Sequence, residues 1–264
     1  MAGVLLSELD SGVLSLTLNR PEQHNALNSE LITAIRTGLR SAGADPAVRV
    51  IVLTGSGGSF CAGADLLEVE SVAPDPARFR VWLHAWSDTF RAAELCGKPV
   101  IAAVNGAAMA GGLELALASD LIVASSRARF CDAHIRHGLV PGGGGTQRIP
   151  AAVGTRWARW LMYTGEVIDA AKAERIGLVQ KVIAEDDFAP EVRELARVMA
   201  TRSSVALSFM KRMTGSRLVA QDMLEMEIEA AAHIVAGPDA LEGLAAFKER
   251  RDPVFESDGR DWKS

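Results

Sequence analysis

Glu114 is the side chain whose type and surroundings point most directly to chemistry. It follows Gly111 and Gly112 and lies within an apolar run that ends at Ala118. Burying a carboxylate among such neighbours is costly unless it is partnered, and burial raises the pKa of a carboxyl toward the range of a general base. A glutamate that faces solvent or pairs with a basic group is the alternative. The pattern therefore makes Glu114 a candidate base.

Two runs of small residues could hold a developing negative charge. Residues 60–66 follow one β-type run, and residues 105–112 follow another, at a point where a helix is expected to begin. Small side chains leave backbone N–H groups approachable, and the first N–H groups of a helix lack intrahelical partners. Small residues at such turns also serve packing alone. Taken together, the two strand ends predict a two-donor oxyanion hole.

Asp132, His134 and His137 bring imidazole and carboxylate groups into one short segment. The spacing is similar to part of a metal site, but a third ligand at firm spacing is missing and no helix is expected to align the two histidines. We therefore predict no metal, and we interpret His134 as a catalytic or a structural imidazole. No base is tied to Cys61 in the sequence, which favours a small buried thiol over a nucleophile.

Two glycine clusters could be mistaken for nucleotide sites. Residues 55–60 follow a strand, but Phe60 stands at the sixth position of the dinucleotide fingerprint. Residues 141–146 lack the lysine that a phosphate-binding loop needs. Both clusters instead predict tight turns where the backbone passes close to another backbone or to a ligand.

Composition narrows the class of protein. The 264 residues are 48% hydrophobic and 23% charged, which is typical of a globular chain. The formal net charge is −5 and aromatic residues make up 5%, so nucleic acid is not an expected partner. The three cysteines form no CxxC pair, which indicates a reducing compartment.

The sequence also bears on location. The N-terminal residues have neither a basic start nor a long apolar run, so we predict a cytoplasmic protein. Residues 100–118 are apolar enough to imitate a membrane span, but Glu114 and three glycines disfavour insertion. No membrane partner is expected.

The elements that must position these groups follow from periodicity and turn signals. Two β-type runs around a glycine turn predict a hairpin, and Asn28 or Ser29 can cap the helix that follows. Further strands and one helix recur in the same order, which indicates an α/β core. The predicted strands are 4–9, 13–19, 48–54, 100–104, 121–124, 128–131 and 178–183. The predicted helices are 112–118, 157–163, 170–175, 188–202, 205–213, 219–236 and 241–250.

These motifs resemble the crotonase superfamily, also called the enoyl-CoA hydratase/isomerase family, over nearly the whole chain. The matching segments are 20–28, 60–66, 105–114, 138–148 and 164–179. The resemblance implies a spiral core of repeated ββα units, assigned here to residues 1–190, and a C-terminal helical region at 191–264 that serves trimerisation and covers the active site. It also implies acyl-CoA thioester substrates, with coenzyme A as part of the substrate and no separate cofactor, and a homotrimer or a dimer of trimers.

The resemblance assigns roles to particular residues. The oxyanion-hole donors would be the N–H groups of Ala64 and Gly111, in the two loops chosen above on chemical grounds. Lys248 or Arg251 would reach the phosphates of coenzyme A. The residues that would line the substrate and coenzyme A site are His24, Ala26, Ala62, Ala64, Asp65 and Leu66.

One position departs from the family pattern. Hydratases of this family place two glutamates around the double bond; one aligns with Glu114, and the position of the second is occupied by His134. The leading hypothesis is enoyl-CoA hydration, with Glu114 as the base that activates water and His134 as the donor of the α-proton. The alternatives are a double-bond isomerase, an acyl-CoA hydrolase and a non-catalytic acyl-CoA binder.

The acyl chain length is not readable from the sequence. Trp82, Trp86 and Phe90 lie at helical spacing after the first donor loop. They could shape the acyl pocket, although such a stripe is more often part of the core.

Overall fold

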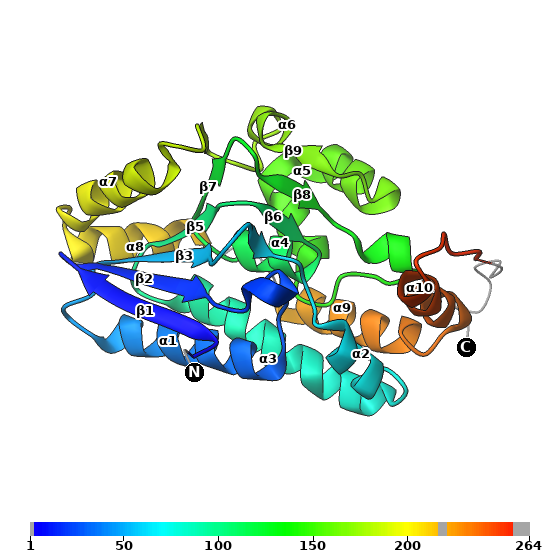
Figure 1. The fold of residues 1–264 in the computed structure, drawn as a ribbon. Coiled ribbons are helices and arrows are strands. Elements are labelled where there is room, and N and C mark those ends of the chain that lie inside the picture. The colour runs from blue at the N-terminus through cyan, green and yellow to red at the C-terminus, as the bar shows by residue number, and fades with distance from the viewer. Residues whose placement is uncertain (1–2, 216–220, 256–264) are drawn as a thin grey trace.

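Two β-sheets form the centre of the molecule. The computed structural model describes residues 3–215 and 221–255. The larger sheet has the strand order β1 (Leu5–Asp10), β2 (Val13–Leu18), β3 (Val50–Gly55), β5 (Val100–Val104), β7 (Leu121–Ser125) and β10 (Lys181–Ile183). The smaller has the order β4 (Ser59–Cys61), β6 (Ala107–Met109), β8 (Arg129–Cys131) and β9 (Ile168–Asp169). Neighbouring strands are parallel except for β1 with β2 and β8 with β9 (Figure 1).

Three successive units have the same plan. In each, one strand joins the larger sheet, the next joins the smaller sheet, and helical structure follows. The units are β3–β4 with α2 (Leu66–Val72) and α3 (Pro76–Leu95), β5–β6 with α4 (Gly111–Leu117), and β7–β8 with η2 (His134–His137) and α5 (Gly145–Thr164). This arrangement confirms the predicted spiral of ββα units, and it stacks the three strand-to-helix turns side by side.

The N-terminal part follows the turn and cap signals. β1 and β2 form an antiparallel hairpin in which Asp10 pairs with Val13. The N-terminus of α1 (Ser29–Ala44) is capped by Asn28, whose side-chain oxygen accepts from the N–H of Leu31 at 2.9 Å.

The larger sheet is covered on both faces. Its central strands β3 and β5 are almost wholly buried, as their β-branched sequences predict. One face packs against the main core, which includes α1 and α3, and the opposite face packs against α7 (Phe188–Ala200). The turns at the carboxyl ends of the strands are therefore held on a rigid, desolvated frame.

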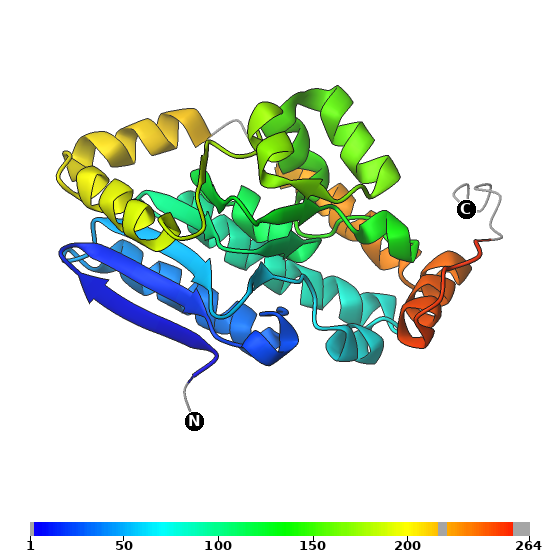
Figure 2. The same ribbon diagram turned by 45° about the horizontal axis from the view of Figure 1, so that its top comes forward.

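The C-terminal part is helical, as predicted. It continues with α8 (Ser204–Gly215), α9 (Gln221–Ile234) and α10 (Pro238–Glu249). α9 packs along α3, and α10 packs against η2 at the end of the molecule opposite to α7 and α8 (Figure 2). The division at residue 190 and the role of these helices in assembly stay predictions. Residues 219 and 220 of the predicted helix 219–236 lie outside the described residues.

Some elements differ from the sequence-based prediction. α5 begins at Gly145 rather than at residue 157, although it contains Pro150 and a non-helical Gly154 with φ of 74°. These two residues interrupt the helical pattern and hide its first half. β6 falls within a predicted loop, because a three-residue strand is too short to show periodicity. No helix in the described residues is both long and apolar enough to cross a membrane.

Candidate active site

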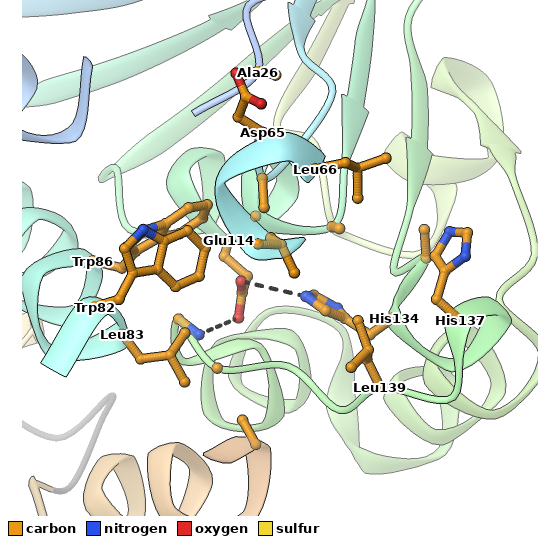
Figure 3. Close-up of a pocket in the computed structure, with 18 of the residues that line it drawn as sticks. Ala26, Asp65, Leu66, Trp82, Leu83, Trp86, Glu114, His134, His137 and Leu139 are labelled. Atoms are coloured by element: carbon orange, nitrogen blue, oxygen red, sulfur yellow. Dashed lines mark hydrogen bonds and ion pairs between the residues drawn. The ribbon is translucent and has the colours of Figure 1, made fainter. Parts of the chain in front are cut away.

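A cavity of about 410 Å³ lies where the strand-to-helix turns meet α3, η2 and α10. Its wall carries the two loops of small residues, together with Glu114 and His134. Figure 3 shows Glu114 and His134 pointing toward one another across the cavity, with the two indoles of Trp82 and Trp86 on one side. The groups that the sequence singled out separately thus share one site.

The two donor loops touch one another. A methyl group added at Gly63 would lie 3.4 Å from the nitrogen of Gly111. Ala64 and Gly111 both line the cavity. In residues 3–215 and 221–255, the N–H of neither residue donates to another protein group. Two adjacent, unpaired N–H donors at the wall of an apolar cavity suit an oxyanion.

The second loop has an unusual backbone at the residue that precedes the donor. Ala110 has φ of 45° and ψ of −117°, a conformation that costs an alanine about 1–3 kcal/mol. A hydrogen bond of 2.9 Å from its N–H to the carbonyl of Cys131 helps to hold it there. Gly111 then starts α4 in contact with Trp86, and a Cβ at this position would lie 2.4 Å from the indole ring. Only glycine therefore fits between the loop and Trp86.

Arg20 fixes the first loop. Its guanidinium forms an ion pair of 2.7 Å with Asp65 and donates to the carbonyl of Ala26 at 2.5 Å. The other carboxylate oxygen of Asp65 accepts from the N–H of Leu67 and so caps α2. Asp65 thus shapes the loop that carries Ala64.

Glu114 is buried, with 3% of its residue surface exposed. Its Oε1 accepts from the N–H groups of Gly143 and Gly145 at 2.9 and 2.8 Å. Its Oε2 lies 3.8 Å from Nε2 of His134. Burial raises the pKa of Glu114 to about 7, even though the charge of His134 acts in the opposite direction. One oxygen is therefore held by the protein, and the other is left for a proton.

Asp132 determines the state of His134. The Asp132 carboxylate is hydrogen-bonded to Nδ1 of His134, so Nε2 is the nitrogen that points toward Glu114. Burial disfavours the charged imidazole, but the charge and the hydrogen bond of Asp132, together with the charges of Glu114 and Glu227, outweigh it and raise the pKa of His134 to about 9. At neutral pH the site therefore holds an imidazolium beside a partly ionised carboxyl.

Comparisons with known proteins agree with this geometry. Residues 8–258 match the family model for enoyl-CoA hydratase/isomerase. The chain belongs to the enoyl-CoA hydratase/isomerase family. It is 38% identical over 254 residues to a crotonyl-CoA hydratase of Syntrophomonas wolfei, an alignment that covers 95% of this chain and 97% of that protein.

Other members of the family resemble the chain over a similar length. A 1,2-epoxyphenylacetyl-CoA isomerase of Escherichia coli is 33% identical over 97% of this chain and 99% of its own. The crystal structure of an enoyl-CoA hydratase from Mycobacterium avium subsp. paratuberculosis superposes with a TM-score of 0.88 at 31% identity, covering 97% of this chain and 100% of that one. Both hydratases and isomerases thus share this fold.

In this family member, most of the predicted site residues come together. The cavity wall includes Ala26, Ala62, Ala64, Asp65, Leu66, Gly111, Glu114 and His134. His24 is exposed, and its side chain lies 3.4 Å from the hydroxyl of Ser59. Its backbone carbonyl accepts from the N–H of Ala62 at 3.0 Å, so His24 contributes to the loop through its main chain.

The two C-terminal basic residues have different surroundings. Arg251 makes a two-pronged ion pair with Glu242, at 2.5 and 2.8 Å. The side chain of Lys248 is 70% exposed and lies 3.4 Å from Glu70. Lys248 is therefore the freer of the two cations to reach a phosphate, and this assignment stays a prediction.

The aromatic residues of α3 both line the cavity and pack in the core. Phe79, Trp82 and Trp86 line the cavity, with ring centroids 5.4 and 4.7 Å apart along the series. Phe90 is fully buried behind them, with its ring edge toward Trp86. The stripe is core on one side and cavity wall on the other.

His137 and Cys61, the other candidates for chemistry, take no direct part in the pairing of Glu114 with His134. His137 lines the cavity, but its ring packs edge-on against Phe247 at 5.3 Å rather than joining His134. Within residues 3–215 and 221–255, no group of three or more histidine, cysteine, aspartate or glutamate side chains is arranged to hold a metal ion. Cys61 is buried, and burial raises the pKa of its thiol to about 12, which suits a packing residue.

Sequence reasoning missed two residues that support the site. Asp132 was seen only as a possible metal ligand, and Glu227 in α9 was not seen at all. Glu227 is 5% exposed and binds the glycine loop that holds Glu114. The available signal was the alternation of Glu225, Glu227 and Glu229 with apolar residues, but nothing local says which of these carboxylates faces the interior.

Proposed function

We propose that the chain is an enoyl-CoA hydratase that adds water to trans-2-enoyl-CoA thioesters. The observation that carries this proposal is the placement of Glu114 and His134. Their facing atoms lie 3.8 Å apart on the wall of the cavity that also carries the free N–H groups of Ala64 and Gly111. One proton acceptor, one proton donor and two oxyanion donors are the groups that this addition requires.

The reaction follows from these positions. The thioester oxygen accepts from the N–H groups of Ala64 and Gly111, which draws electrons from the double bond. Oε2 of Glu114 removes a proton from a water molecule while the oxygen of that water bonds to the β-carbon. The π electrons of the double bond move to the thioester oxygen, which gives an enolate. His134 then gives its Nε2 proton to the α-carbon. Return of the proton from Glu114 to His134, directly or through solvent, resets the site.

The ionisation states suit these roles. A base must be ionised and an acid protonated at the same pH. The raised pKa of Glu114 makes it a stronger base than an ordinary carboxylate, and the raised pKa of His134 keeps its proton in place at neutral pH. Retention of a carboxylate in so apolar a segment also favours catalysis over simple acyl-CoA binding.

The test is loss of enoyl absorbance with short and medium trans-2-enoyl-CoAs. We expect turnover by the wild type and its loss in Glu114→Gln and His134→Ala. Calorimetric binding of the same thioesters without turnover would overturn the proposal in favour of a binder, and release of free coenzyme A would point to a hydrolase.

A double-bond isomerase is the second candidate. It is favoured by His134, because a single carboxylate is enough to move one proton between two carbons. An isomerase of a different substrate, the 1,2-epoxyphenylacetyl-CoA isomerase of Escherichia coli, is also a relative of this chain. Mass spectrometry separates the two reactions, since hydration adds one water to the substrate and isomerisation leaves its mass unchanged.

We further propose a homotrimer or a dimer of trimers in the cytoplasm, with coenzyme A carried only by the substrate. Exposed apolar side chains on α8 support assembly: Val205, Phe209 and Met213 are between 56% and 68% exposed and recur every four residues. Light scattering after size-exclusion chromatography tests this, and a monomeric mass at micromolar concentration would contradict it.

A further inference from the structure

We propose that Glu227 of α9 is a positioning residue for Glu114, acting through the glycine loop between them and through its own charge. The proposal rests on the proposed function, in which Glu114 is the base. It assigns to the C-terminal helices a part in the chemistry of the site, in addition to covering it.

The loop at residues 143–146 connects the two carboxylates. Its four successive N–H groups alternate between them: Gly143 and Gly145 donate to Glu114, and Gly144 and Thr146 donate to Glu227. The hydroxyl of Thr146 also donates to Glu227. A rotation of the loop that released Glu227 would therefore turn the other two N–H groups away from Oε1 of Glu114.

The N–H groups of Gly144 and Thr146 and the hydroxyl of Thr146 all donate to Glu227, which suits an ionised carboxylate. The residue is 5% exposed, so its charge is poorly screened by solvent. Burial is the first cause of the raised pKa of Glu114, and the charge of Glu227 adds to it. Two buried like charges thus lie on opposite sides of one loop.

The other groups that face Glu114 are few. His134 and Asp132 lie on the η2 side. From α5, Arg148 donates to the carbonyl of Gly143 and forms an ion pair of 2.7 Å with Glu94. α3 presents Trp86 and Phe90, which carry no charge. On α9, Glu227 is thus a carboxylate that direct hydrogen bonds tie to the loop.

The competing explanation is that Glu227 only caps the start of α5. If it did only that, its replacement by a neutral residue would lower stability and leave the ionisation of Glu114 unchanged. The two explanations differ in the pH at which Glu114 titrates. That pH can be measured without any substrate, so the result does not depend on which reaction the enzyme performs.

The experiment titrates Glu114 by carbon-13 NMR of the full-length protein labelled at the glutamate carboxyl carbons. Glu114→Gln identifies the resonance. In Glu227→Gln, which keeps the shape and removes the charge, we expect the Glu114 midpoint to fall by about one pH unit. Glu229→Gln is the matched control, because Glu229 lies on the same helix and pairs with Arg80 at the surface at 2.7 Å. We expect no shift in this control.

A second variant separates charge from position. Glu227→Asp keeps the charge but shortens the reach, so we expect a smaller change of the midpoint and a fall in kcat of roughly tenfold at unchanged KM. An unchanged Glu114 midpoint in Glu227→Gln, or a kcat in Glu227→Asp equal to that of the wild type, would overturn the proposal.

If Glu227→Gln does not fold, Thr146→Val provides the test. It removes one donor from Glu227 and leaves all carboxylates in place. We expect a fall in kcat that Thr146→Ser restores, and an unchanged kcat in Thr146→Val would overturn the positioning role. If the midpoint shifts as expected while no thioester is hydrated, the proposed reaction is wrong and the role of Glu227 stands.

Discussion

The cavity has two unlike walls. One is polar: Glu114 and His134 face it, backed by Asp132 and Glu227, and hydrogen bonds hold each of these carboxylates. The other is aromatic: on α3, Phe79 stacks on Trp82, and the ring of Trp82 is tilted by 50° against that of Trp86. The N–H of Trp82 donates to Glu68 at 3.2 Å. In the proposed reaction the polar wall moves protons, and the aromatic wall excludes water and gives the cavity its shape.

The two walls meet at Gly111. Its N–H is one of the two donors proposed for the oxyanion hole, and its α-carbon packs against the indole of Trp86. Because the two walls carry different groups, we expect substitutions on the polar wall to change kcat. Substitutions on the aromatic wall should change KM and the choice of acyl group. Changes at Gly111 should act on both.

The largest effect is expected for Glu114→Gln. The amide keeps the size of the side chain and can still accept from the glycine loop, but it removes no proton from water. We expect kcat to fall by about 10²–10⁴-fold with KM within a few-fold of the wild type. Steady-state kinetics on a trans-2-enoyl-CoA measure both. A large rise in KM with an unchanged kcat would break the proposed division between the walls.

Gly111→Ala tests the position at which the polar and aromatic walls meet. The new methyl group would lie 2.4 Å from the Trp86 ring, so the donor loop must move. Loss of one oxyanion donor lowers kcat by about 10²–10³-fold. We expect Trp86→Leu to recover part of this loss in the double variant, because it removes the clash. A double variant no better than Gly111→Ala would show that the loop is damaged for another reason.

Asp132→Asn tests the orientation and charge of His134. The asparagine removes one of the charges that raise the pKa of His134, so the alkaline limb of the kcat/KM profile, which we expect near pH 9 in the wild type, should move to lower pH. The acidic limb, set by Glu114 near pH 7, should move much less. We also expect kcat to fall by about tenfold at the optimum. An alkaline limb that stays in place would assign it to another group.

The same pair contributes to stability with a definite sign. The folded-state pKa of His134 is raised, so its pairing with Asp132 stabilises the fold fully below the unfolded pKa of histidine and is lost as pH rises through the folded value of about 9. The difference in Tm between the wild type and Asp132→Asn should therefore shrink from pH 6 to pH 10. A constant difference across this range would argue against the ion pair.

The smallest effect is expected for Trp86→Leu. Trp86 makes no hydrogen bond to the reacting groups, and the change leaves the polar wall intact. We expect KM to rise by about threefold to tenfold for short thioesters and kcat to change by less than about threefold. Bulkier acyl groups should be affected less, because the leucine leaves room. A loss of kcat comparable to that of Glu114→Gln would remove the distinction between the walls.

Much of the site could be predicted because its signals are local. A glycine run after a buried strand, or a glutamate within an apolar helix, restricts backbone and charge within a few residues. The two donor loops and Glu114 were predicted in this way, and His134 was a candidate imidazole. The resemblance to the family singled out Ala64 and Gly111 within the loops and gave His134 its position opposite Glu114. The ββα repeat is likewise visible as recurring local order.

Contacts between segments that are distant in the sequence depend on the tertiary structure. Periodicity shows that Trp82 and Trp86 lie on a buried face, but only packing shows that this face is the wall of a cavity. Asp132 and His134 are two residues apart, yet their alignment required the 3₁₀ turn of η2. Glu227 reaches Gly144 across 83 residues of sequence. Local sequence determines which groups are present, while their partners depend on how α9 and the loops pack together, which no short window of sequence records.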